Sequence, residues 1–160
     1  MPPLEVPTDF ELPRSRFDEL LGTEWVSDDP ERAVARIGVR DELRQPVGLI
    51  HGGVFSSVIE SLCSRATALA VLPDGMIAMG QSISVSFVRS LTEGGAEVVA
   101  TARHRGRSTW VWDVDVTDEA GRLCATAQMT IAVRPLPQEV IDRYSPPETA
   151  AGDGAPAGGD

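Results

Sequence analysis

One carboxylate, Glu60, lies among apolar and small polar side chains in the middle of the segment from Val47 to Leu72. This segment opens with a glycine-rich turn at residues 48–53 and then continues without Gly or Pro. Its apolar residues recur at intervals of three and four, which predicts an α-helix with one broad apolar face. A carboxylate on such a helix is suited to act as a general base or as a nucleophile towards a bound electrophile.

The glycine-rich turn places His51, Gly52 and Gly53 directly before the predicted helix. A helix N-terminus presents free backbone N–H groups and about half a positive charge. Because Gly52 and Gly53 have no Cβ, a carbonyl oxygen can approach these groups closely. The pattern favours a site that polarises a carbonyl, where each donor typically contributes about 3 kcal/mol. His51 is either a catalytic base or a residue that caps and shapes the turn, and we prefer the second role.

The elements that must position these groups are predicted from changes in sequence period. A short helix over residues 14–21 and strands over residues 23–26 and 32–39 come before the long helix. Beyond the Pro-Asp-Gly turn at 73–75, apolar and polar residues alternate as in strands. This alternation is centred on residues 83–87, 98–102, 110–116 and 123–133. We expect these four long strands to form an antiparallel meander in chain order, with the helix packed on one face, which is an α+β fold.

The composition indicates one soluble domain. The chain has 160 residues, 42% of them hydrophobic, and a formal net charge of −10, which argues against binding to nucleic acid or to an anionic membrane. No uninterrupted apolar run approaches the ~20 residues that span a bilayer. The N-terminus is acidic and rich in proline, unlike a secretory or transit signal, so we expect a cytoplasmic location. Cys63 and Cys124 have no metal-ligand spacing, and we expect both to be small buried side chains and no metal to be bound.

All basic residues are arginines, and four of them fall close together in the sequence: Arg89, Arg103, Arg105 and Arg107. On an acidic protein, such a cluster favours a small anionic ligand. The alternative is that these arginines are solvated charges along strands. The terminal segments are interpreted as an arm with a short helix (1–21) and a tail (137–160) that is disordered towards its end.

Three features together resemble the hotdog-fold acyl-CoA thioesterases. These are the Gly-x-x-His-Gly-Gly turn ending at Gly53, the acid Glu60 nine positions after the histidine, and the Arg-Gly-Arg-Ser-Thr sequence at 105–109. The PaaI-like branch and the Arthrobacter-type 4-hydroxybenzoyl-CoA thioesterases are the most similar branches. The resemblance covers roughly residues 22–135. It implies a hotdog domain over 22–136, in which an antiparallel sheet wraps a long central helix.

The resemblance also implies roles for individual side chains. The catalytic carboxylate of the family falls on Glu60, and its amide side chain, an Asn or Gln, falls on Gln45. The backbone donor that polarises the thioester carbonyl falls on Gly52 or Gly53. A hydroxyl that holds the acid or a water falls on Ser64.

Contacts to the nucleotide end of CoA fall on Arg89, Ser108 and Thr109, with Arg107 nearby. CoA is then part of the substrate, and the resemblance implies no separate cofactor and no metal.

The spacing of Gly52 and Glu60 has a geometric consequence. The two residues are eight positions apart, so on one straight helix they are separated by roughly 12 Å of rise. Both cannot touch one thioester carbon. We therefore predict that the glycine donor and Glu60 of one site come from different subunits of an obligate homodimer, itself part of a homotetramer.

Other functions and roles compete with this interpretation. A hotdog dehydratase or hydratase pairs a catalytic His with an acid, but here Gly-Gly follows His51 where a His-Phe-Pro type of motif is expected. A non-catalytic acyl-CoA-binding hotdog protein lacks the helix acid or carries a DNA-binding extension. Glu60 could also be a buried acid without chemistry, held by Ser56, Ser57 or Ser64. The thioesterase is preferred, and the small polar residues around Glu60 favour an aromatic or a short-to-medium acyl group.

Overall fold

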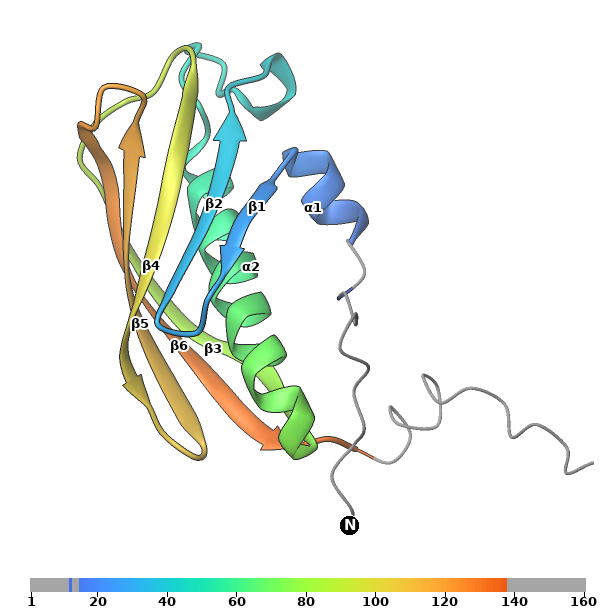
Figure 1. Ribbon diagram of the computed structural model, residues 1–160. Helices are drawn as coiled ribbons and strands as arrows, with labels where there is room; N and C mark the ends of the chain where they lie inside the picture. Colours follow the sequence, from blue (N-terminus) through green and yellow to red (C-terminus); the bar gives the residue numbers. More distant parts are fainter. Residues whose placement is uncertain (1–11, 13–14, 138–160) are drawn as a thin grey trace, which may run out of the picture.

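A long helix lies against one six-stranded antiparallel sheet that curves around it (Figure 1). The computed structural model describes residue 12 and residues 15–137. The helices are α1 (Arg16–Leu21) and α2 (Gly52–Val71), with 3₁₀ turns η1 (Asp41–Leu43) and η2 (Leu72–Asp74). The strands are β1 (Glu24–Asp28), β2 (Arg32–Gly38), β3 (Met76–Phe87), β4 (Gly95–Arg105), β5 (Thr109–Asp118) and β6 (Leu123–Pro135).

Helix α2 forms where the spacing of apolar residues predicts it. Val58, Ile59 and Leu62 are fully buried against the sheet. The helix passes into the 3₁₀ turn η2, and Gly75 ends that turn in the left-handed conformation at φ 70°, which glycine adopts without a Cβ penalty. By length and mean hydropathy alone, the segment Gly52–Asp74 could cross a membrane. The core helix of a folded domain passes the same test, and α2 packs on all six strands of the sheet.

The four long strands exist, but the prediction that they form a meander in chain order is wrong. The strand order is β1-β2-β4-β5-β6-β3, so β3 pairs with β6 and not with β4. Only β4, β5 and β6 are a meander. After β3, the chain crosses the N-terminal end of α2, where Ile50 N–H donates to Leu91 O at 2.9 Å, and β4 then pairs with β2. Alternation in a sequence indicates which face a residue occupies and does not indicate which strand is its neighbour.

The smaller elements that the sequence predicts are present, with ends shifted by one or two residues. Helix α1 starts at Arg16, two residues later than predicted, because Ser15 caps it by accepting the Asp18 N–H. It ends at Gly22, as predicted, with φ 67°. The sequence did not indicate the 3₁₀ turn η1 in the polar loop. Most of the predicted arm and nearly all of the predicted tail lie outside the described residues.

The buried face of β5 supplies the largest fully buried side chain, Trp112. Its indole Nε1–H donates to Thr67 Oγ1 on α2 at 3.0 Å, and the Thr67 hydroxyl donates in turn to Cys63 O. Trp110 packs beside it with a ring-centroid distance of 5.9 Å. The polar atoms of this contact between helix and sheet are therefore paired, and both tryptophans are buried.

The predicted cluster of four arginines is not one surface patch in a single chain. Arg89 N–H donates to Cys124 O at the start of β6, whereas the β4–β5 turn lies beside the last residues of β6, because Ser108 O accepts the Val133 N–H. Nine residues of strand separate these points, which is roughly 30 Å. Strand β4 carries the chain from one end of the sheet to the other, so proximity in sequence is lost.

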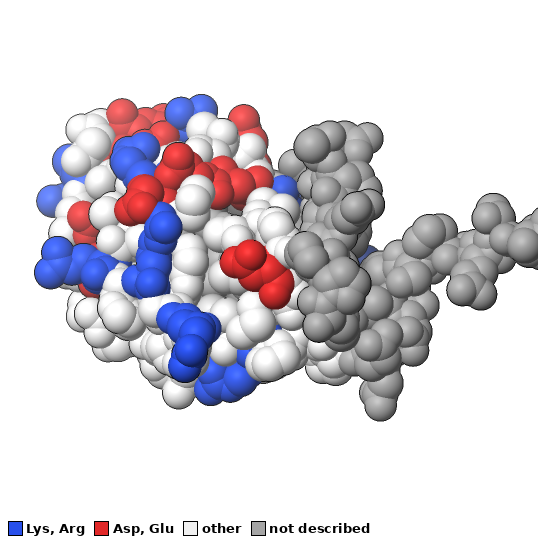
Figure 2. Space-filling model, turned by 60° about the horizontal axis from the view of Figure 1, so that its bottom comes forward, with Lys and Arg blue, Asp and Glu red and all other residues white. Residues whose placement is uncertain are grey.

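The arginines of β4 are paired with carboxylates. Arg103 bonds Asp113 at 2.9 Å, and Arg105 contacts Glu31 and lies over the Trp110 ring. Figure 2 shows basic and acidic side chains interspersed on the face seen from below the view of Figure 1. These pairings agree with the alternative in which Arg103 and Arg105 are solvated charges along a strand.

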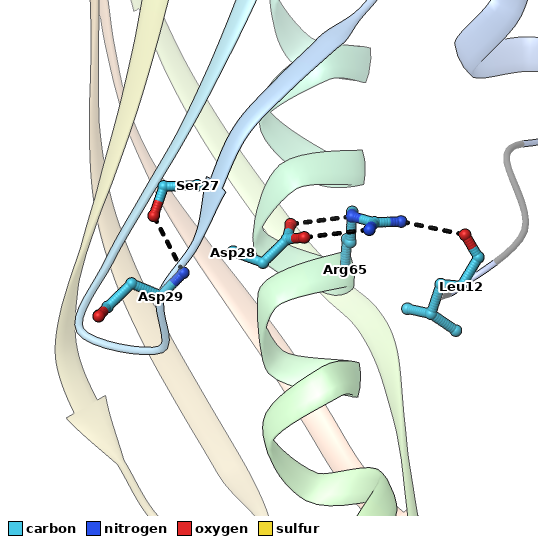
Figure 3. Close-up of polar contacts among 5 residues, drawn as sticks. All are labelled: Leu12, Ser27, Asp28, Asp29 and Arg65. Carbon is cyan, nitrogen blue, oxygen red and sulfur yellow. Dashed lines mark hydrogen bonds and ion pairs between the residues drawn. The ribbon is translucent and has the colours of Figure 1, made fainter. Parts of the chain in front are cut away.

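Helix α2 is tied to β1 by Arg65 (Figure 3). Its Nε and Nη2 donate to the two oxygens of Asp28 at 2.8 and 3.0 Å, and Nη1 donates to Leu12 O at 3.3 Å. The guanidinium also lies 5.5 Å from the centre of the Trp25 ring. The two charged side chains are only 16% and 30% exposed, so water screens the pair weakly.

We predict that Arg65→Met lowers the free energy of unfolding by about 1–3 kcal/mol, because it leaves Asp28 without its bidentate partner. The matched control is Arg36→Met, which breaks a pair with Glu97 whose side chains are 54% and 38% exposed. For Arg36→Met, the decrease in the free energy of unfolding should stay below about 1 kcal/mol. Urea unfolding at one protomer concentration measures both. Equal losses for the two variants would contradict the prediction.

Candidate active site

Helix α2 begins with a histidine cap. His51 has an extended backbone (φ −71°, ψ 132°), and its Nδ1 accepts a hydrogen bond of 3.0 Å from the Gly53 N–H. Within the described part of the chain, the N–H of Gly52 has no acceptor, as expected for the first residue of a helix. Two backbone donors were predicted from the sequence. The Gly53 N–H is bonded to His51 Nδ1, so only the Gly52 N–H is free to bind an acceptor from outside the described residues.

A cleft of about 470 Å³ opens beside this N-terminus. Its lining comes from the loop before α2, the first turn of α2 and the segment that follows β3. Five predicted site residues share this lining: Gln45, His51, Gly52, Gly53 and Arg89. A larger cleft of about 540 Å³, at the ends of β2, β4 and β5, contains none of the predicted residues.

The loop that carries Gln45 is held by Arg44, which the sequence analysis did not single out. Arg44 Nη1 donates to Gly48 O and to Thr92 O, both at 2.6 Å. One guanidinium thus joins the glycine turn to the segment between β3 and β4. An arginine in a polar loop gives no sequence signal for such a role.

Phe87 forms the apolar wall of the cleft next to Gly52. A Cβ at position 52 would lie only 2.9 Å from Cζ of Phe87. The ring also packs on Phe55 with a centroid distance of 6.4 Å, yet 55% of the residue stays exposed. The absence of a Cβ at Gly52 therefore leaves room for this ring. The contact joins the helix to the end of β3, and sequence spacing did not reveal it.

Glu60 lies two turns further along α2 and does not line this cleft. It is half-buried, and the Ser64 hydroxyl donates to its Oε1 at 3.2 Å. On the other side, its carboxylate meets the backbone of β3 at Gly80. The structure thus divides the predicted catalytic residues of one chain into two groups, the cleft at the helix N-terminus and the Glu60–Ser64 pair.

The predicted CoA contacts are divided as well. Arg89 lies in the cleft, whereas Arg107, Ser108 and Thr109 belong to the β4–β5 turn and the start of β5, at the opposite end of β6. Within one chain these residues do not form one binding surface. Ser108 O accepts hydrogen bonds from Arg134 Nη1 and from Val133 N–H, which fixes the turn against β6.

The cysteine thiols are poorly suited to catalysis. Cys63 is fully buried, and burial together with the Glu60 charge raises its pKa well above the ordinary value. Burial also raises the pKa of the Cys124 thiol. A thiol must ionise to be a good nucleophile, so neither group fits that role. In residue 12 and residues 15–137, no three His, Cys, Asp or Glu side chains gather in a way that could hold a metal ion.

A curved six-stranded antiparallel sheet around one long central helix matches the hotdog fold of solved thioesterase structures. A model of the thioesterase superfamily matches residues 47–125. The 1,4-dihydroxy-2-naphthoyl-CoA hydrolase of Listeria monocytogenes is 34% identical over 118 residues, which are 74% of this chain and 95% of that protein. The chain therefore belongs to the thioesterase superfamily.

Solved structures agree with this assignment. A variant of a thioesterase from Pseudomonas aeruginosa, in which one glutamine is changed to alanine, is 34% identical with a TM-score of 0.72, covering 75% of this chain and 86% of that one. A thioesterase from Staphylococcus aureus, also with a glutamine changed to alanine, is 25% identical with a TM-score of 0.73, covering 76% and 100%. The hotdog fold and the hydrolase class expected from the sequence are confirmed.

Proposed function

We propose that this protein hydrolyses an acyl-CoA thioester to the free acid and CoA, with Gly52 N–H as carbonyl donor and Glu60 as general base or nucleophile. The observation that carries the proposal is a pair of groups on helix α2. The Gly52 N–H faces a cleft and has no acceptor among the described residues, and two turns further along Glu60 accepts a hydrogen bond from the Ser64 hydroxyl. In the Staphylococcus aureus thioesterase, the glutamine and the glutamate chosen for replacement are fifteen positions apart. Gln45 and Glu60 have the same separation.

The reaction needs a more electrophilic carbonyl and a nucleophile. The Gly52 N–H and the helix dipole stabilise negative charge on the carbonyl oxygen as the tetrahedral intermediate forms. With Glu60 as base, water loses a proton to the carboxylate, a bond forms between its oxygen and the carbonyl carbon, and the C–S bond then breaks. The proton ends on the departing sulfur. With Glu60 as nucleophile, a carboxylate oxygen bonds to the carbonyl carbon, the C–S bond breaks, and the CoA thiolate takes a proton from solvent. Water then hydrolyses the resulting anhydride, which releases the acid and restores the Glu60 carboxylate.

Supporting roles follow from the contacts around the cleft. His51 fixes the first turn through its bond to Gly53 and so directs the Gly52 N–H outwards. The Gln45 amide lines the cleft, where it can bind the carbonyl oxygen or the acyl group. Ser64 orients the carboxylate of Glu60.

The complete site requires two chains. Gly52 and Glu60 are separated by roughly 12 Å of helix rise, and only Gly52 belongs to the cleft. Edge strand β3 exposes Met79, Ile83 and Phe87, at 46%, 38% and 55%. An exposed apolar edge strand favours pairing with another chain. We propose a homodimer joined along β3, in which Glu60 of one subunit faces the cleft of the other, and a homotetramer that brings Arg107, Ser108 and Thr109 to the CoA.

The substrate proposed is an aromatic or a short-to-medium acyl-CoA. The Phe87 ring beside Gly52 offers an apolar surface to a group attached to the bound carbonyl. The Listeria monocytogenes relative is named for an aromatic acyl-CoA. Membership of the PaaI-like branch, a cytoplasmic location and the absence of a separate cofactor, of nucleic acid and of a membrane partner remain predictions.

Steady-state hydrolysis of an acyl-CoA panel, followed by a thiol reagent that detects free CoA, tests the function. The panel contains benzoyl-, 4-hydroxybenzoyl-, phenylacetyl-, short-chain and long-chain CoA. We expect kcat/KM for at least one aromatic or short-chain ester to exceed that of the long-chain esters by tenfold or more, about 1.4 kcal/mol. Binding of these esters without release of CoA would support the alternative, a non-catalytic acyl-CoA-binding protein. Hydration or dehydration of an enoyl or 3-hydroxyacyl ester would support a dehydratase or hydratase.

A further inference from the structure

Gly80 lies where the carboxylate of Glu60 meets the edge strand. A Cβ at position 80 would be 2.8 Å from Oε1 of Glu60 and 3.0 Å from Cε of Met129. Real Cβ atoms essentially never approach other heavy atoms closer than 3.0 Å. The space that Glu60 Oε1 occupies is therefore available only because residue 80 has no side chain.

The strand around Gly80 is irregular at the same point. Gly80 pairs with Ile131 and Ser82 pairs with Thr130, so the register of β3 and β6 shifts between them. A glycine within a strand often marks a bulge or a close approach of another group to the backbone, and both occur here. The backbone of Gly80 is not in the left-handed region, so turn conformation does not explain the glycine.

We infer that Gly80 is a positioning residue, which creates the notch on β3 that holds the Glu60 carboxylate in its reactive position. Ser64 restrains the carboxylate from the helix side and the notch restrains it from the strand side. This inference rests on the proposed catalytic role of Glu60, and it extends that role to a residue that does not contact substrate.

Gly80→Ala separates positioning from folding. The three atoms nearest to the new methyl group belong to the flexible side chains of Glu60 and Met129, so the chain can fold while the carboxylate moves aside. We expect kcat to fall roughly ten- to hundredfold, because displacements of about 1 Å in an active site have effects of this size. KM should change less than twofold.

Gly38→Ala is the matched control. Gly38 ends β2, its backbone is not left-handed, and an added Cβ meets no heavy atom within 4 Å. This variant should keep wild-type kcat. A loss of kcat in Gly38→Ala similar to that in Gly80→Ala would show that any alanine in the sheet disturbs activity, and the inference would be wrong.

A double-mutant cycle tests whether Gly80 acts through Glu60. In a Glu60→Gln background, Gly80→Ala should cause no further loss of kcat, whereas independent effects would multiply. In a Glu60→Ala background, which removes Oε1 and Cγ of Glu60 but leaves Cε of Met129, Gly80→Ala should lower the melting temperature less than it does in the wild type.

The outcomes distinguish this inference from the proposed function. Full activity in Glu60→Gln overturns the catalytic role of Glu60 and the inference with it. A strong loss in Glu60→Gln together with wild-type kcat in Gly80→Ala overturns the inference alone. The inference is also overturned if the double variant shows a loss of kcat equal to the product of the losses in Gly80→Ala and Glu60→Gln.

Discussion

Glu60→Gln should reduce kcat for acyl-CoA hydrolysis by two or more orders of magnitude while the protein keeps its fold and its subunit assembly. Glutamine has the same shape, and its carbonyl oxygen can still accept the bond that Ser64 donates at 3.2 Å. What is lost is the negative charge, which both the nucleophilic and the general-base mechanism need. A factor of a hundred corresponds to about 2.7 kcal/mol of activation free energy.

The control for this change is Glu119→Gln. Glu119 is an exposed acid in the β5–β6 turn, so the variant removes the same charge from the chain at a site outside the proposed machinery. Its kcat and KM should match the wild type. The circular dichroism spectrum, melting temperature and sedimentation of Glu60→Gln should also match those of the wild type. Undiminished hydrolysis by a folded Glu60→Gln protein would mean that the carboxylate is structural, as one of the alternatives drawn from the sequence holds.

Glu60→Asp provides a second comparison. It keeps the charge but withdraws it by one methylene group from the Ser64 hydroxyl and from Gly80. If the reaction depends on charge at a defined point, Glu60→Asp should lie between the wild type and Glu60→Gln in kcat. If Glu60→Asp and Glu60→Gln are equally inactive, position matters as much as charge.

The sequence predicted the parts of the molecule that depend on local pattern. Helix α2, its glycine turn and the acid within it follow from spacing along one segment, and the structure places all three as expected. The strand faces follow in the same way, since Trp112, Val114 and Val116 alternate with Asp113 and Asp115 and are buried. Local spacing determines such features because helix and strand geometry are periodic.

The parts that could not be predicted depend on contacts between distant segments. The placement of β3 beside β6 pairs strands that are far apart in the chain, and alternation within β3 carries no information on it. The contact of Phe87 with Gly52 and that of Gly80 with Glu60 both depend on this placement. A glycine just before the alternating residues 83–87 was the one available signal for the second contact.

Two inactive variants should regain activity when their subunits are mixed. The first is Glu60→Gln. The second is Gly52→Pro, which removes the proposed N–H donor but not the helix, because proline is well tolerated at the first helical position. His51 before it already has the extended backbone that a residue preceding proline adopts. We expect Gly52→Pro alone to lower kcat by roughly 10²- to 10³-fold.

Gly52→Ala separates loss of the donor from steric effects. Alanine keeps the N–H and places a Cβ against the half-exposed ring of Phe87, as proline also does. A smaller loss in Gly52→Ala than in Gly52→Pro assigns the difference to the N–H. If Gly52→Pro does not fold, Gln45→Ala replaces it, since Gln45 lines the same cleft.

Activity returns on mixing only if each site uses two chains. In a mixed dimer, one site combines the intact Gly52 side of the first variant with the intact Glu60 of the second, and the other site carries both changes. Random exchange of equal amounts makes half of the dimers mixed, so activity should rise to about a quarter of the wild-type value. The separation of roughly 12 Å along α2 is the physical reason.

The negative control mixes Glu60→Gln with the double variant Glu60→Gln/Gly52→Pro, which cannot produce an intact site in any dimer and should stay inactive. Sedimentation analysis at micromolar concentration must show an assembly, and a fully active monomer would contradict the two-chain site. Subunits that exchange without regaining activity would place Gly52 and Glu60 of one site in the same chain. In that case the acid would have to reach the cleft across roughly 12 Å of helix rise, and the apolar edge of β3 would need another explanation.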